Sequence, residues 1–173
     1  LASKDDELLT EVSKILSCET MRIYKSHDVL GVEIGGALKN IIAFCCGIVA
    51  ELGLGTNASS AIITRGLAEI ARLGVKMGAS KETFYGLSGL GDLILTCSSD
   101  ESRNRRAGRL IGKGLSIDEI KKEIGMTIES IDNIEIAHRL AEKYNVEMPI
   151  VNSVYDVIFN NKPMTDVSNS LMT

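Results

Sequence analysis

The sequence predicts an all-α, multi-helix domain preceded by one short helix and one strand. From residue 29 onward, apolar residues recur at helical spacing, with capping residues and glycines where helices should begin and end. Hydrophobic residues make up 45% of the 173 residues but aromatic residues only 4%, so aliphatic side chains must fill the core. That composition favours closely packed helices and excludes a disordered or low-complexity chain.

The first 28 residues have the pattern of a different kind of domain. Residues 5–16 have helical spacing and an acidic start, and residues 21–25 alternate apolar and polar side chains as a short strand does. One strand cannot form a sheet alone. We therefore expect residues 1–28 to be the last helix and strand of a larger α/β domain, and residues 29–173 to form a helical domain.

Seven helices are expected in this helical domain. The first is apolar nearly all round, which predicts a central, buried helix. Its uninterrupted apolar run of about 14 residues is too short to cross a bilayer, so no membrane span is expected. Asn57 should cap the second helix, Gly78 should end it, and Pro149 should open the last. The expected ranges are 29–52, 58–77, 80–87, 105–111, 116–124, 131–144 and 150–159.

Charge and cysteine content exclude several classes of function. The net charge of −4 offers no attraction for nucleic acid or for an anionic membrane, so neither is expected as a partner. The four cysteines lack zinc-ligand spacing and only two histidines are present, so no metal site is expected. Free thiols favour a reducing, cytoplasmic compartment.

Two sequence features resemble functional signals but have a structural interpretation. The motif Gly53-Leu-Gly-Thr-Asn-Ala58 matches a dinucleotide-binding fingerprint, which needs a strand before it. A helical segment precedes it here, so we interpret it as a loop between two helices. His138 lies in an amphipathic segment near Arg139 and Glu142, which predicts a position on the solvated face.

Lys39 and Asp92 are polar residues in apolar surroundings. Lys39 follows the small residues 35–37. Burial of an amine is costly, so such a lysine is expected to have an interaction partner or a functional role. Burial lowers the pKa of a lysine toward the range where it exchanges protons with a substrate hydroxyl. Asp92 would orient that amine if the two were close, and Thr96 lies one helical turn further on. The alternatives are a lysine that reaches water and an aspartate that caps a turn.

A third polar segment is suited to an anion. Ser102, Arg103 and Asn104 supply a hydroxyl, a guanidinium and an amide near an expected helix N-terminus, which suits a phosphate group. For Arg106 and Arg109 we prefer an ordinary surface position. Together the three polar regions predict an active site for a small phosphorylated substrate.

Four motifs resemble those of the bacterial-type NAD(P)-dependent glycerol-3-phosphate dehydrogenases, in the same order and with matching gaps, from about residue 20 to the end of the chain. The motifs are residues 31–40, 62–69, 89–93 and 102–106. The resemblance implies an all-α substrate domain similar to the C-terminal domain of 6-phosphogluconate dehydrogenase. It also implies hydride transfer between sn-glycerol 3-phosphate and NAD or NADP, giving dihydroxyacetone phosphate, in the supply of glycerol 3-phosphate for phospholipids.

The resemblance also implies roles for single residues. Lys39 would be the catalytic base for the C2 hydroxyl, and Asp92 its supporting carboxylate. Arg103 and Glu129 would contact the cofactor. Thr127 stands where the family often has a valine, so that contact is a departure from the pattern. Substrate contacts are implied for Lys39, Asn40, Asp92, Thr96, Ser102, Arg103 and Asn104.

Of the family's N-terminal Rossmann domain, only the final helix and strand have a counterpart here, in residues 1–28, and its glycine fingerprint has none. The chain is therefore expected to be a fragment that does not catalyse alone, because the dinucleotide lacks its cradle. A homodimer is a further expectation. Two alternatives stay open: another dehydrogenase with a helical C-terminal domain, such as a 6-phosphogluconate or hydroxyacid enzyme, and a non-catalytic helical module that binds a phosphorylated metabolite or drives dimerisation.

Overall fold

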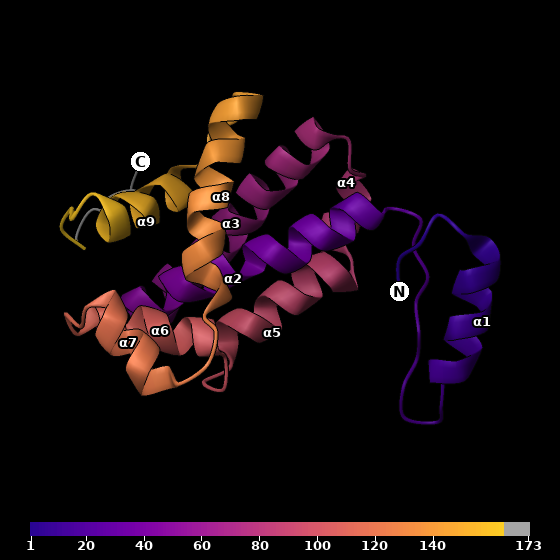
Figure 1. Cartoon of the computed structure of the whole chain (residues 1–173), viewed down its shortest axis with the longest axis horizontal. Helices are drawn as coiled ribbons and strands as arrows, with labels where there is room; N and C mark the ends of the chain where they lie inside the picture. Colours follow the sequence, from indigo (N-terminus) through magenta and orange to yellow (C-terminus); the bar gives the residue numbers. More distant parts are fainter. Residues whose placement is uncertain (165–173) are drawn as a thin grey trace.

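The computed structural model describes residues 1–164, and the predicted all-α fold is confirmed there. Helices surround a central α2, while α1 stands apart at the end of an irregular N-terminal segment (Figure 1). In chain order the elements are α1 (Asp6–Leu16), α2 (Val29–Glu51), α3 (Gly55–Met77), α4 (Lys81–Tyr85), the π-helical turn η1 (Leu87–Gly91), α5 (Asp92–Ser98), α6 (Arg103–Gly112), α7 (Ile117–Ile124), α8 (Glu129–Tyr144) and α9 (Pro149–Phe159).

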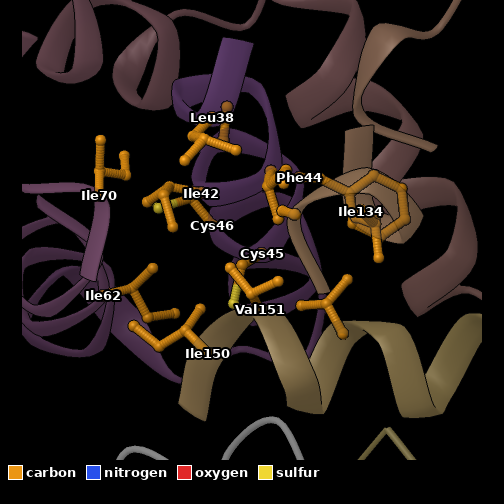
Figure 2. Close-up of a cluster of buried hydrophobic side chains, with 14 of the residues drawn as sticks. Leu38, Ile42, Phe44, Cys45, Cys46, Ile62, Ile70, Ile134, Ile150 and Val151 are labelled. Carbon is orange, nitrogen blue, oxygen red and sulfur yellow. The ribbon is translucent and has the colours of Figure 1, made fainter. Parts of the chain in front are cut away.

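The central helix α2 is enclosed by its neighbours, as its apolar sequence predicts. Every residue from Ile41 to Val49 is buried, and α3, α5, α6 and α8 all pack against the helix. α2 is long and apolar enough to cross a membrane, but 72% of that stretch is covered by other parts of the protein. It is the core helix of the bundle. Figure 2 shows its side chains among those of α3, α8 and α9, with labels on Ile62, Ile70, Ile134, Ile150 and Val151.

A buried carboxylate connects α3 to the start of α9. Glu69 is only 3% exposed, and its two oxygens accept hydrogen bonds from the backbone N–H groups of Ile150 (2.8 Å) and Val151 (3.3 Å). A helix leaves its first N–H groups without partners, and α9 has no capping side chain of its own. Glu69 therefore supplies the cap from another helix. Burial raises the pKa of this carboxyl from 4.5 to about 7, although both hydrogen bonds act in the opposite direction.

The strand predicted over residues 21–25 is wrong. Ala2 and Ser26 make one isolated parallel bridge, in which Ser26 N donates to Leu1 O (2.9 Å) and Ser3 N donates to Ser26 O (3.1 Å). Parallel pairing is stable mainly in sheets whose two faces are covered, and no further strand extends the ladder within residues 1–164. The bridge does have strand–helix–strand order, because α1 joins the two bridged segments.

The boundaries of α3 differ in part from those predicted. The helix begins at Gly55, its N-cap is Leu54, and Asn57 lies inside the first turn instead of capping it. Gly53 and Gly55 have φ angles of 70° and 81°, which favour glycine and make a tight connection to α2. The glycine motif therefore joins two helices, as predicted. Gly78, with φ 104°, ends the helix where expected.

His138 is half-buried, so the prediction of a solvated position is wrong. Its ring stacks on Tyr155 of α9, with 3.9 Å between the ring centroids. Its Nδ1 lies 2.9 Å from Oδ1 of Asn152. Periodicity along α8 did not reveal that α9 covers this side of the helix.

We expect the stability of Glu69→Gln to depend less on pH than that of the wild type. Because the folded-state pKa is raised, folding gains stability from Glu69 that is present below about pH 4.5 and is lost as pH rises through about 7. The change is at most about 3 kcal/mol. Glutamine offers only one acceptor oxygen, so the variant should be less stable at pH 5 by about 1 kcal/mol, with the difference shrinking by pH 8.

Urea unfolding measured between pH 5 and pH 8 tests this expectation. Glu123→Gln removes an exposed carboxylate from α7 and serves as the control, which should keep the wild-type slope. A wild-type slope in Glu69→Gln would contradict the assignment of the pH dependence to this carboxyl.

Candidate active site

Lys39 of α2 and Asp92 of α5 form an ion pair. The Lys39 Nζ donates a hydrogen bond to Oδ2 of Asp92, across 53 positions of sequence. The two side chains are 22% and 34% exposed, so the pair is partly desolvated but open to a ligand. The structure thus brings together the two residues that the sequence singled out. Lys39 does not simply extend into water.

The π-helical turn η1 sets the position of Asp92. No helix was expected between residues 88 and 104, but η1 runs directly into α5. A Cβ on Gly89 would overlap the backbone of Phe84, and a Cβ on Gly35 would lie 3.2 Å from the carbonyl oxygen of Ser88. Glycine at these positions lets the turn lie close to α2. Asp92, the next residue, then reaches Lys39.

A close helix crossing holds α6 against α2. A Cβ on Gly108 would overlap the carbonyl oxygen of Phe44, and a Cβ on Gly47 would overlap that of Arg105. Ser102 caps α6 by accepting a hydrogen bond from Arg105 N (3.3 Å). The crossing brings the N-terminus of α6 to the same end of α2 as the cleft described next.

Lys39 and the start of α6 border one open cleft of about 470 Å³, whereas Asp92 pairs with Lys39 but does not itself line the cleft. Arg103, the first residue of α6, makes no hydrogen bond or ion pair with residues 1–164 that would occupy its guanidinium. Four of the lining residues, Gly36, Leu95, Ser99 and Glu101, were not predicted as site residues, because small, apolar or exposed side chains carry no chemical signal. The lining is Gly36, Lys39, Asn40, Leu95, Thr96, Ser99, Glu101, Ser102, Arg103, Asn104 and Glu129.

The other predicted polar side chains have partners within the protein. Thr96 Oγ1 donates to Asp92 O (2.7 Å) and lies 3.5 Å from Oδ1 of the same residue. Asn104 is buried, and its Oδ1 accepts a hydrogen bond from Ser130 N (3.0 Å) at the start of α8. Asn104 therefore has a structural contact that the sequence did not reveal.

Glu129, the first residue of α8, completes the cleft. Glu129 lies at its rim, where Asn40 Nδ2 donates to Oε2 of the carboxylate (2.8 Å). Thr127 lies in a separate hollow beside Lys121 and Asp132, and does not line the cleft. A larger hollow, of about 650 Å³, lies elsewhere, against residues 22–26.

Comparison with known proteins decides the family. The family model for the C-terminus of NAD-dependent glycerol-3-phosphate dehydrogenase matches residues 28–169. The chain belongs to this family. The resemblance inferred from the four motifs is confirmed, and this glycerol-3-phosphate dehydrogenase C-terminal domain has the helical fold expected for it.

Individual relatives support the same family assignment. Glycerol-3-phosphate dehydrogenase (NAD(P)+) of Bacillus cereus is 52% identical over 99% of the chain, and that of Shouchella clausii is 50% identical over 99%. A crystal structure of glycerol-3-phosphate dehydrogenase from Coxiella burnetii superposes with a TM-score of 0.92 at 39% identity, over 99% of the chain. The chain spans about half the length of these relatives, namely 50%, 51% and 52%.

We expect Gly108→Ala to destabilise the domain by about 2 kcal/mol, because the added methyl group forces α6 away from the α2 backbone. Thermal unfolding should therefore occur about 4–8 °C lower. Gly36→Ala is the matched control, since no atom lies within 4 Å of its added Cβ. It should leave stability unchanged or raise it by up to about 1 kcal/mol. Equal losses in both variants would show that the α2–α6 crossing is not the cause.

Proposed function

We propose that this chain is the substrate domain of a glycerol-3-phosphate dehydrogenase. The reaction interconverts sn-glycerol 3-phosphate and dihydroxyacetone phosphate with NAD or NADP. The observation that carries the proposal is that Lys39, which is paired with Asp92, lines the same cleft as Arg103. An acid–base group and an anion-binding group in one cleft suit the reduction of a carbonyl in a phosphorylated substrate. The names of the relatives support this substrate.

Lys39 has the chemistry needed for the proton transfer. As the carbonyl is reduced, the Lys39 ammonium donates a proton to the oxygen on C2, and the neutral amine takes it back in the oxidation. Asp92 orients Nζ through its hydrogen bond. Thr96 in turn holds the backbone and one carboxylate oxygen of Asp92. A bound nicotinamide supplies or accepts the hydride.

Arg103 is suited to the substrate phosphate. Its guanidinium offers a fork of N–H donors, and it stands at the N-terminus of a ten-residue helix, where backbone N–H groups and the helix dipole favour an anion. Arg105 is not equivalent, because Asp100 already pairs with it. Arg103 and the carboxylate of Glu129 are also the groups in this cleft that fit a nicotinamide cofactor.

We infer that residues 1–28 belong to an α/β domain that provides most of the cofactor site. The parallel Ala2–Ser26 bridge, with α1 between its two sides, has the order of a βαβ unit. Large apolar side chains are exposed in this segment, as they would be if further structure normally covered them. They are Leu1, Leu8, Ile15, Leu16, Met21 and Tyr24.

A cytoplasmic location and a homodimer are also proposals. All four cysteines are free thiols, which suits a reducing compartment. A small apolar hollow of about 70 Å³ lies between α2, α3 and α8, and Ile136, exposed at its edge, offers a contact to a second copy. The lining of the hollow includes Ile34, Leu73, Met77, Ile136 and Leu140.

In the full-length enzyme we expect Lys39→Met to lower kcat by at least about a hundredfold, because the acid–base group is removed. Cofactor affinity and the far-ultraviolet circular dichroism spectrum should stay close to those of the wild type. Steady-state kinetics and a fluorescence titration with the reduced cofactor measure these quantities. Near-normal turnover in the variant would reject Lys39 as the proton-transfer group.

Arg103→Ala should raise the KM for dihydroxyacetone phosphate by at least about tenfold, as expected for the loss of a charge-assisted hydrogen bond. The slow reaction of unphosphorylated dihydroxyacetone should change little. Arg106→Ala is the control, since that exposed arginine lies outside the cleft lining. If Arg103→Ala weakened both substrates equally, the phosphate assignment would be wrong.

A further inference from the structure

The shorter of the two hydrogen bonds made by the Asn40 side chain joins it to another side chain of the cleft. The residue is 4% exposed, and Nδ2 donates to Glu129 Oε2 (2.8 Å) while lying 3.4 Å from Gly36 O. Both of these partners are acceptors, so the amide nitrogen must face them. The amide nitrogen of Asn40 is therefore oriented toward the Glu129 carboxylate.

Glu129 is held at one oxygen only. Its side chain is exposed at the first position of α8, and Oε2 takes the hydrogen bond from Asn40. Within residues 1–164, no protein donor occupies Oε1. A long carboxylate side chain normally has many rotamers, and holding one in place reduces the entropy lost when a ligand binds.

We propose that Asn40 is a positioning residue for Glu129. By fixing one carboxylate oxygen, Asn40 leaves the other oriented as a hydrogen-bond acceptor for the hydroxyl or amide N–H groups of the nicotinamide cofactor. Asn40 thus contributes to cofactor binding through Glu129, and not chiefly through contact with the phosphorylated substrate. This inference rests on the proposed function.

The start of α8 is also anchored without Asn40. Asn104 Oδ1 accepts from Ser130 N (3.0 Å), and Asn133 Nδ2 donates to Ala37 O (2.9 Å) one helical turn further along the same interface. Loss of the Asn40 amide should therefore free the carboxylate without moving the helix. Asn133 also offers a matched control, because it joins α2 to α8 but does not line the cleft.

A donor–acceptor exchange in the full-length enzyme tests the inference. Asn40→Asp places two carboxylates face to face, and Glu129→Gln places two amides there; each should weaken binding of the reduced cofactor by about tenfold. In the double variant the amide introduced at position 129 donates to the carboxylate introduced at position 40, and the oxygen of that amide is again free at the rim. Cofactor affinity should then recover to within about threefold of the wild type.

The readouts separate positioning from a general structural role. Cofactor affinity should change in Asn40→Asp more than the KM for dihydroxyacetone phosphate does, and Asn133→Ala should leave both near wild type. Additive losses in the double variant, or an equal loss in Asn133→Ala, would overturn the inference. If Asn40→Asp fails to fold, Asn40→Ala serves instead, because it should add no further loss to Glu129→Ala.

The failure of this inference differs from that of the proposed function. If the wild-type enzyme bound no nicotinamide cofactor, both the proposed function and the role of Asn40 would be rejected. A wild-type enzyme with normal turnover, combined with additive losses in the double variant, would remove only the role of Asn40.

Discussion

Complete burial of α2 is the constraint on which the rest of the structure depends. From Ile41 to Val49 the helix has no exposed residue, so its polar side chains are confined to Glu51 at the C-terminal end and to the end that precedes this stretch. Lys39 and Asn40 stand at that end, where desolvation makes an unpartnered amine or amide costly. Asp92 of α5 and Glu129 of α8 supply the partners. The cleft therefore lies where α2 meets α5 and α8, which supply the hydrogen-bond partners of its polar side chains.

Small residues control how closely the other helices approach α2. Gly47 and Gly108 let α6 cross against the α2 backbone, and Gly66 of α3 leaves room for the side chain of Ile42. This explains why one of the four motifs, residues 62–69, contributes nothing to the cleft. Within it, Gly66 permits packing and Glu69 caps α9. A motif shared with a family of enzymes can thus be structural throughout.

Much of this arrangement could be predicted from the sequence, because the signals were local. Periodicity and capping residues located the helices, and an amine beside small residues in an apolar segment singled out Lys39. Apart from the N-cap misplaced at Asn57, the failures depended on contacts between distant segments. The stacking of His138 on Tyr155 follows from the packing of α9, and the contact of Asn104 with Ser130 joins α6 to α8. Residues 21–25 alternate like a strand, but a strand also needs neighbours to pair with.

The charges of the cleft determine how a phosphorylated substrate would lie in it. Lys39 and Asp92 neutralise each other, and the carboxylate of Glu129 repels an anion from the rim near Asn40. Arg103 is the cleft-lining cation that no carboxylate among residues 1–164 neutralises. A phosphate should therefore bind at the α6 end, and the rest of the molecule must extend toward α2. For the triose phosphate proposed as substrate, that orientation would direct the carbonyl oxygen toward Nζ of Lys39, the group proposed to transfer the proton.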